Sequence, residues 1–320
     1  MVMAYSSNTR VAHIMDIAYV PSTITRQARS HNRPWVVHNL PPVKFSPSGL
    51  ASRFVDLKHW LRGRKAVDLV HVHYATNGYY LWGFDGPSVL HFHGSDARIN
   101  SQQPGVRQVI EASIKAASAV VYATPDLGET LSTLAPKATY LPNPAPILPP
   151  GFVPEKAVPN RIVFNARWDD TKGGMKLVEA AKELVNYGFD VHSIDWGTYR
   201  QEARDAGVIM HPLMPMNDFA SLLSTGSVVV GQFGFRALSI SDMLTLKVGR
   251  PLMTIPLTGL YEDSFPLPGA ELDTLAEQVA DFATAKLDSV DSSVLTDWID
   301  EQHGIESCLQ TWEDLYRSIS

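Results

Sequence analysis

Prolines are concentrated in one internal stretch of the chain, between Leu141 and Pro159. They stand at positions 142, 144, 146, 149, 150, 154 and 159. Proline lacks an N–H group and fixes its own φ, so neither a helix nor a central strand can run through this stretch. A chain of 320 residues also exceeds the size at which a single hydrophobic core usually stops growing. We therefore predict two domains, 1–148 and 149–300, joined by a proline-rich linker.

Apolar strand-like runs alternate with helix-like segments on both sides of this linker. Before it, the expected strands are 11–15, 34–37, 68–73, 88–92 and 119–122, and the expected helices are 50–65, 106–117 and one that begins near Pro21. After it, strands are expected at 161–166, 190–195, 207–210, 227–231 and 251–255, and helices at 173–187, 198–206, 216–224, 239–248, 271–286 and 293–319. This alternation predicts an α/β fold, with a parallel sheet in each half covered by helices on both faces.

Charge is distributed unevenly between the halves. Residues 1–150 contain 14 Lys and Arg against 8 Asp and Glu, whereas the remainder contains 13 against 25. In the expected helix 50–65, an apolar face (Phe54, Leu57, Trp60 and Leu61) is accompanied by Arg53, Lys58, Arg62, Arg64 and Lys65. A basic half is typical of contact with an anionic acceptor, a membrane surface or nucleic acid, and is equally an ordinary variation of surface charge. Peripheral membrane contact through the basic 53–65 helix is therefore one of our expectations.

The cysteine count and the hydropathy of the chain indicate the cellular compartment in which the protein is expected. Cys308 is the single cysteine, so an intramolecular disulfide is impossible. No signal-peptide pattern and no apolar run near about 18 residues occurs. We expect a cytoplasmic protein without a transmembrane segment.

A polar cluster follows the expected strand 161–166. Arg167 and Lys172 supply positive charge, and Gly173 and Gly174 allow backbone N–H groups to approach a ligand closely. Ligands of open α/β sheets bind at the carboxyl ends of strands, and helix N-termini there favour anions. This cluster predicts a diphosphate site, the alternative being a surface turn with two solvated cations.

A second cluster, His93-Gly94-Ser95-Asp96, follows the expected strand 88–92. Asp96 could orient a hydroxyl, act as a base or cap a helix. Asn143, between two prolines, could donate to a ligand or close a turn.

A third loop follows the strand 227–231. It carries Gln232, Gly234 and Arg236 and leads to Ser239 and Asp242 at the start of a helix. We expect a second anion site there. The alternative is a loop that only connects the strand to the helix. At the first expected helix, Ser22 and Thr23 are expected to cap the free N–H groups.

Two His-x-His pairs, His71 with His73 and His91 with His93, lie on expected strands. Imidazoles on adjacent strands can bind zinc. Without accompanying cysteines, we instead predict no metal site: some of these histidines lie in the core, and His93 lines the cleft as a hydrogen-bonding group.

The order of these motifs resembles that of retaining, nucleotide-sugar-dependent glycosyltransferases of the GT-B fold, family 4. The resemblance runs nearly end to end and rests on the segments 68–73, 93–96, 123–127, 141–144, Arg167 with Lys172-Gly173, and 249–251. It implies two Rossmann-like domains facing across a cleft, with a C-terminal helix, 301–320, returning to the N-terminal domain.

The resemblance also implies roles for particular residues. Arg167 and Lys172 would bind the donor diphosphate and His93 would lie near the donor sugar, and no metal would be essential. One departure is visible, because the two glutamates usual in the family, eight positions apart, correspond here to Arg236 and Leu244. Leucine accepts no hydrogen bond and arginine only donates.

We therefore predict a metal-independent, hexosyltransferase-like retaining enzyme that uses a UDP- or GDP-sugar and needs no further cofactor. His93, Asp96, Arg167 and Lys172 are the candidate catalytic residues. The donor would also contact Gly173 and Asn143, together with Gln232, Gly234, Arg236, Ser239 and Asp242. The acceptor (a protein, glycan, lipid or modified nucleic acid) would lie near Pro21, Ser22, Thr23 and Ser95. The alternative is a catalytically silent GT-B protein that binds a nucleotide or glycan or scaffolds a partner.

Overall fold

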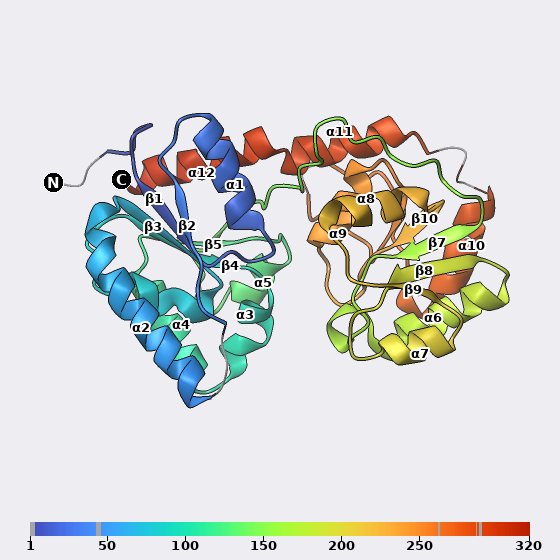
Figure 1. Ribbon diagram of the computed structural model, residues 1–320, viewed down its shortest axis with the longest axis horizontal. Helices are drawn as coiled ribbons and strands as arrows, with labels where there is room; N and C mark the ends of the chain where they lie inside the picture. Colours follow the sequence, from blue (N-terminus) through green and yellow to red (C-terminus); the bar gives the residue numbers. More distant parts are fainter. Residues whose placement is uncertain (1–3, 43–45, 262, 286, 288–289) are drawn as a thin grey trace. The chain divides into compact units, whose positions relative to one another are not determined.

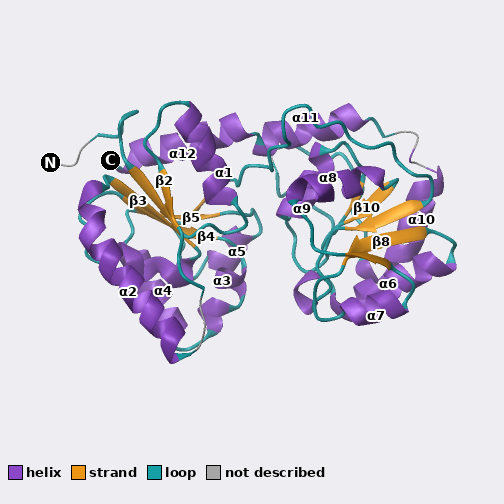
Figure 2. Ribbon diagram, viewed as in Figure 1, coloured by secondary structure: helices purple, strands orange, loops and turns teal. Residues whose placement is uncertain are grey.

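The computed structural model describes residues 4–42, 46–261, 263–285, 287 and 290–320. The chain divides into two compact units, Met1–Pro144 with His303–Ser320, and Ala145–Gln302. Each unit contains one parallel sheet with helices on both of its faces (Figure 1, Figure 2). The prediction of an α/β fold with two parallel sheets is confirmed.

The first unit contains a six-stranded sheet in the order β2-β1-β3-β4-β5-β6. Its strands are β1 (Val11–Ile14), β2 (Val36–His38), β3 (Leu69–His73), β4 (Ser88–Phe92), β5 (Ala119–Tyr122) and β6 (Thr139–Tyr140). Its longer helices are α1 (Val20–Ser30), α2 (Pro47–Gly63), α4 (Val106–Ala116) and α12 (Ile305–Ile319), and short ones are α3 (Ser95–Arg98) and α5 (Leu127–Leu131). Strands β1, β3 and β4 are buried along their whole length, as expected for a sheet covered on both faces.

The second unit contains a five-stranded sheet in the order β11-β10-β7-β8-β9. Its strands are β7 (Arg161–Phe164), β8 (Asp190–Ile194), β9 (Ile209–His211), β10 (Val228–Val230) and β11 (Leu252–Met253). Its helices are α6 (Gly174–Asn186), α7 (Arg200–Asp205), α8 (Met216–Thr225), α9 (Ile240–Lys247), α10 (Leu275–Ala285) and α11 (Ser292–His303). Figure 2 shows α6 and α7 on one side of this sheet and α8 and α9 on the other. All five predicted strands of this half are present.

The C-terminal helix belongs to the first unit, as predicted. Helix α12 packs on α1, and its Glu313 carboxylate accepts a hydrogen bond from Arg33 Nε at 2.6 Å. The prediction of one continuous helix over 293–319 is wrong, because Gly304 adopts extended ψ of 141° and separates α11 from α12. Residue 286, the last of the helix expected at 271–286, lies outside the described residues.

Two local predictions in the first unit are also wrong. Neither Ser22 nor Thr23 caps α1; the Asp16 carboxylate accepts the Ser22 N–H instead, at 3.0 Å. On α2, Trp60 is buried but Phe54 and Leu61 are 70% and 44% exposed. The basic helix therefore presents apolar side chains to its surroundings as well as to the core.

Candidate functional site

The carboxyl edge of the second sheet brings three loops together. The β7–α6 loop carries Arg167 and Lys172, the β8–α7 loop carries Trp196, and the β10–α9 loop carries Gln232. Phe233 N–H donates to the Lys172 carbonyl at 2.9 Å, so the first and third loops are in direct contact. A Cβ on Gly234 would lie 1.9 Å from the Thr171 carbonyl oxygen, which only glycine permits at this approach.

The guanidinium group of Arg167 lines an open hollow of about 310 Å³. The other lining residues are Asp169, Trp196, Gly197, Thr198 and Arg200. The Arg167 Cζ atom lies 5.0 Å from the centre of the Trp196 ring, and that indole is 50% exposed. Arg167 also forms an ion pair with Asp169. Two guanidinium groups and an exposed indole in one hollow suit an anionic ligand with a planar part.

Lys172 lies five residues after Arg167 on the same loop. Its Nζ is 4.4 Å from the centre of the Phe235 ring, and its charge lowers the pKa of Asp242 against the larger, raising effect of burial. Gly173 has φ of 131° at the start of α6, a conformation open to glycine. The predicted cationic residues and glycines are thus on one loop, with Arg167 directed to the hollow and Lys172 toward Phe235.

In the β10–α9 loop, the side chains of the predicted residues Gln232 and Arg236 form hydrogen bonds with backbone groups of the protein. Gln232 is fully buried and its amide nitrogen donates to the carbonyl groups of Phe235 and Ala237 at 2.6 Å each, while its oxygen accepts the Gly234 N–H. Arg236 is exposed and donates from Nη2 to the Thr258 carbonyl at 3.0 Å. These contacts hold the shape of the loop.

The start of α9 is closed by the helix's own side chains. Ser239 and Asp242 form a capping box: the Ser239 hydroxyl accepts the Asp242 N–H, and Asp242 Oδ2 accepts the Ser239 N–H at 2.7 Å. The expectation of a free anion site at this helix start is therefore wrong, because a carboxylate already occupies it. Leu244 is 2% exposed and packs in the core, so it offers nothing to a ligand.

The carboxyl edge of the first sheet holds the other predicted residues. His93 follows β4, and its Nε2 lies 2.9 Å from His73 Nδ1. The Ser95 hydroxyl is exposed and bonded to the Tyr74 hydroxyl at 2.8 Å. Pro21, Ser22 and Thr23 form the first turn of α1. These side chains gather at the ends of β1, β3 and β4, which are neighbours in the sheet.

Asp96 anchors this edge rather than offering a free carboxylate. It is fully buried, and burial raises its pKa while four backbone hydrogen bonds oppose the shift. Oδ2 accepts the Ala75 N–H at 2.7 Å, and Oδ1 accepts N–H groups of His93, Gly94 and Ala97. Of the roles considered for Asp96, a structural cap is the one that these contacts favour.

Asn143 is 7% exposed and its side-chain Oδ1 has no hydrogen-bond partner among the described residues. Its carbonyl oxygen lies 2.8 Å from His303 Nδ1. Its side chain therefore retains an unused acceptor.

Sequence reasoning missed the β8–α7 loop. Trp196, Arg200 and the buried Asn165 all lie at the carboxyl edge of the second sheet. The Asn165 amide nitrogen donates to the Thr245 hydroxyl at 3.0 Å. The available signal was the exposed-loop sequence Asp195-Trp196-Gly197 directly after a predicted strand.

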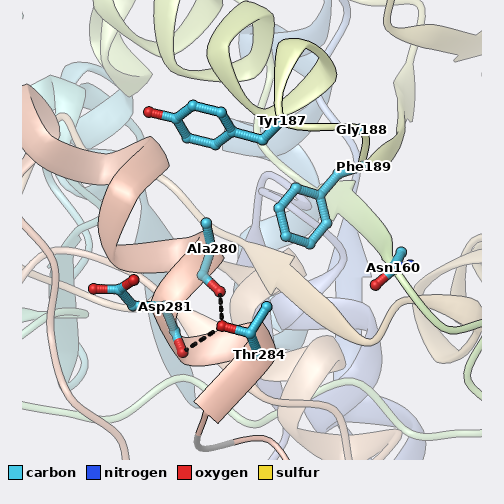
Figure 3. Close-up of a pocket in the computed structure, with 7 residues that line it drawn as sticks. All are labelled: Asn160, Tyr187, Gly188, Phe189, Ala280, Asp281 and Thr284. Atoms are coloured by element: carbon cyan, nitrogen blue, oxygen red, sulfur yellow. Dashed lines mark hydrogen bonds between the residues drawn. The ribbon is translucent and has the colours of Figure 1, made fainter.

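A second hollow, of about 300 Å³, lies at the opposite end of the same sheet (Figure 3). It is lined by Asn160, Tyr187, Gly188, Phe189, Ala280, Asp281 and Thr284. Asn160 and Phe189 precede β7 and β8, whereas ligands of such sheets bind at the carboxyl ends. The Thr284 hydroxyl is already bonded to the Ala280 carbonyl at 2.9 Å. This hollow carries none of the predicted site residues.

Within the described residues, no helix is both long enough and apolar enough to cross a membrane.

The architecture defines the class of fold. Two units with parallel, helix-covered sheets and a C-terminal helix in the first unit constitute the GT-B fold. No protein-family model matches the chain. No curated protein matches it in sequence.

Solved structures of similar fold include three synthases of sugar phosphates or starch. Sucrose-phosphate synthase from Thermosynechococcus elongatus is 15% identical with a TM-score of 0.74, over 97% of this chain and 99% of that one. The UDP-forming α,α-trehalose-phosphate synthase from Burkholderia xenovorans is 10% identical with a TM-score of 0.70, over 98% and 99%. The catalytic domain of starch synthase IV from Arabidopsis thaliana, solved with ADP and acarbose, is 11% identical with a TM-score of 0.66, over 98% and 99%.

Proposed function

We propose that this protein is a retaining glycosyltransferase, similar to family 4, that moves a hexose from a nucleotide diphosphate to an acceptor hydroxyl. The end-to-end similarity to sucrose-phosphate and trehalose-phosphate synthases supports this class of reaction. The observation that carries the proposal is the hollow at the carboxyl edge of the second sheet, where Arg167 lies over Trp196. UDP- or GDP-sugars are the proposed donors, and no metal or further cofactor takes part in the transfer.

Arg167 and Lys172 would bind the donor diphosphate. Gly173 is the N-cap of α6, whose first N–H groups add a positive dipole next to these two cations. A diphosphate leaving group gains negative charge as the glycosidic bond breaks, so fixed cations stabilise the transition state more than the ground state. Arg167 would leave its ion pair with Asp169 for the stronger charge of the diphosphate.

Four of the remaining predicted donor residues would act through the loops that they hold. Gln232 and Gly234 shape the β10–α9 loop, and Ser239 and Asp242 close the start of α9. We therefore propose them as positioning residues. Arg236 and the unused Asn143 Oδ1 remain candidates for direct contact with the donor.

The first domain would present the acceptor. His93, Ser95 and the turn from Pro21 to Thr23 lie at one edge of its sheet and offer imidazole and hydroxyl groups to a sugar or acceptor. Asp96 would keep His93 in place through their shared turn. The protein's contribution is then orientation of donor and acceptor, which can supply about 7–11 kcal/mol of barrier reduction.

Binding and turnover test this proposal separately. UDP, GDP and ADP are titrated calorimetrically, and UDP-glucose, GDP-mannose and ADP-glucose are assayed for release of nucleoside diphosphate. Arg167→Ala is expected to weaken diphosphate binding at least about tenfold, because charge-assisted hydrogen bonds contribute about 1.5–3 kcal/mol. Lys172→Ala should behave similarly, and Lys182→Ala, which removes an exposed lysine of α6, should bind as the unaltered protein does. Equal affinity in all three variants would rule out the proposed diphosphate site.

A catalytically silent protein is the second candidate. The observation in its favour is that Leu244 is buried and Asp242 is committed to the capping box, so the carboxylates usual in the family have no evident replacement. This candidate predicts nucleotide binding that Arg167→Ala weakens, without turnover of any donor. Turnover of one donor that Arg167→Ala abolishes excludes it.

We also propose that α2 contacts an anionic membrane surface and that the protein works in the cytoplasm. Leu50, Phe54 and Leu61 are exposed on one side of α2, and helical spacing puts the exposed Lys58 and Arg62 beside them. Such a helix lies in the lipid interface through its apolar face and cationic flank. Phe54→Ser should reduce sedimentation with phosphatidylglycerol vesicles, and Lys115→Glu on α4 should not; equal binding to phosphatidylcholine vesicles would contradict the proposal.

A further inference from the structure

Five histidines gather on one face of the first sheet. His13 lies on β1, His71 and His73 on β3, and His91 on β4, with His93 directly after β4. The strands are neighbours in parallel register, which pairs His13 with His71 and His73 with His91. Because side chains two residues apart point to the same face, all five rings converge. The neighbouring ring centres of His91 and His93 are 4.2 Å apart, and those of His71 and His73 are 4.3 Å apart.

Four of the five histidines are enclosed in the domain interior. His13, His71, His73 and His91 have no exposed surface, and Trp312 of α12 covers them. Burial lowers the pKa of His13 and of His93 to about 3, and burial with neighbouring imidazoles lowers those of the other three.

The hydrogen bonds form two separate chains. One runs from His13 Nδ1 to His73 Nε2 (3.1 Å) and from His73 Nδ1 to His93 Nε2 (2.9 Å). The other runs from the Tyr316 hydroxyl to His71 Nδ1 (2.6 Å) and from His71 Nε2 to His91 Nδ1 (3.1 Å). His91 Nε2 is buried and has no hydrogen-bond partner among the described residues, and an unpaired buried polar atom destabilises the fold.

We propose that His73, His91 and His93 form a binding site for a divalent transition metal of the zinc class. One ring nitrogen from each of the three lies within 4.8 Å of the other two. Three histidines with an open fourth position are an established zinc arrangement, and zinc–nitrogen bonds of about 2.0–2.1 Å need ligands separated by a little over 3 Å. The ligand atoms would be His73 Nδ1, His93 Nε2 and the unpaired His91 Nε2.

The same hydrogen bonds fit this assignment. With His73 protonated at Nε2, it donates to His13 Nδ1; with His91 protonated at Nδ1, it donates to His71 Nε2. His71 then donates from Nδ1 to the Tyr316 oxygen. Metal-binding histidines usually donate their second N–H in this way, which fixes the ring orientation. The hydrogen bond between His73 and His93 then has His93 Nε2–H as its donor, so metal binding requires the His93 proton to move to Nδ1 and displaces only that hydrogen bond.

The chemistry of the ligands selects the kind of metal, and the burial of the histidines selects which three of them bind it. Imidazole nitrogens suit zinc, copper and nickel, whereas magnesium and calcium need oxygen ligands. A second group, His13 with His71 and His73, is equally compact but wholly buried. His93 is partly exposed at the sheet edge, which gives the chosen group a route of entry.

Metal retention tests the proposal without reference to catalysis. The untagged full chain is dialysed against ZnCl₂, then against metal-free buffer, and its zinc content is measured. About one zinc per chain is expected, and His93→Gln and His73→Gln should weaken binding by at least 10–100-fold, the loss usual even for an outer contact. Cobalt substitution should produce the visible absorption of a tetrahedral site.

Two further variants separate the site from general histidine binding. His211→Gln removes one member of the His192–His211 pair in the second domain and should retain full zinc content. His13→Gln should keep the stoichiometry but weaken affinity, because only an orienting contact changes. Circular dichroism verifies folding, and His93→Gln, at the partly exposed position, serves if His73→Gln unfolds. Failure of the unaltered chain to retain zinc, or equal retention by His93→Gln, would overturn the site.

Discussion

Arg167 forms an ion pair with Asp169, two residues further along the β7–α6 loop. The same carboxylate begins the short helix at Asp170–Lys172, since its Oδ1 accepts the Thr171 N–H at 3.1 Å. An anionic ligand must therefore compete with Asp169 for the guanidinium group. The competition is modest because the Arg167 side chain is 37% exposed, and partly solvated pairs contribute about 1 kcal/mol or less.

Asp169→Asn is predicted to strengthen nucleoside diphosphate binding. Asparagine can still accept the Thr171 N–H but no longer neutralises Arg167. The expected gain is about two- to fivefold, the equivalent of about 0.5–1 kcal/mol, measured by calorimetry with UDP, GDP and ADP. Asp170→Asn is the matched control, because its carboxylate accepts from the Tyr199 hydroxyl instead. Equal gains in both variants would mean that general charge, rather than release of Arg167, is responsible.

Ala18→Gly is predicted to stabilise the first domain. Met15, Ala18 and Tyr19 in the β1–α1 loop have positive φ, of 74°, 50° and 61°, a region that disfavours residues with a Cβ. Ala18 is exposed, so glycine removes strain without losing packing. The free energy of unfolding in urea should rise by up to about 1 kcal/mol. Ala28→Gly, inside α1, should lower it by about 1 kcal/mol or more; a loss in both variants would argue against strain at Ala18.

The sequence predicted those features of the fold that depend on residues close together in the chain. Strands, the proline linker and the polar clusters after strands follow from nearest neighbours in the chain, so Arg167 and Lys172 were found at the correct sheet edge. Non-local features were missed. One of the hydrogen bonds that hold the Asp96 carboxylate comes from Ala75, in the segment that follows β3. The gathering of His13 with the later histidines depends on β1 lying beside β3, which no local pattern states.

The capping box at α9 could nevertheless have been predicted from the sequence. Ser239 and Asp242 have the spacing of this motif, and the structure forms it. The hypothesis of an anion site considered the free N–H groups at the start of α9. It did not consider the Asp242 carboxylate, which already accepts one of them.

Ser239→Ala is predicted to destabilise the second domain by about 1 kcal/mol, because an N-cap hydroxyl is lost. Ser239→Gly should lower the free energy of unfolding by only a few tenths of a kcal/mol, because glycine tolerates the cap conformation. Thermal and urea unfolding measure both changes. If Ser239 acts only by positioning the loop, Ser239→Gly should retain more nucleotide affinity than Ser239→Ala; an equal loss of affinity in both variants would instead indicate a direct contact between its hydroxyl and the donor.

Glu313 is predicted to make the docking of α12 sensitive to acid. Its side chain is 4% exposed, and its carboxylate accepts hydrogen bonds from Arg33 at 2.6 Å and from the Tyr5 hydroxyl at 3.0 Å. Burial raises the pKa of Glu313, but the bonds from Arg33 and Tyr5 and the charges of Arg33 and Arg317 outweigh it, so the net shift is downward.

The sign of the pH effect follows from that shift. A carboxyl whose folded pKa lies below its unfolded value, near about 4.3, contributes stability that is complete above that value. The contribution is lost as the pH falls through the lower, folded pKa. Glu313→Gln should therefore reduce the free energy of unfolding at pH 7 by about 1–3 kcal/mol and flatten its dependence on pH in the acid range. Glu306→Gln is the control on the same helix: its carboxylate is 63% exposed, so its removal should change stability by less than about 0.5 kcal/mol. Parallel pH profiles for Glu313→Gln and the unaltered protein would show that the acid sensitivity arises elsewhere.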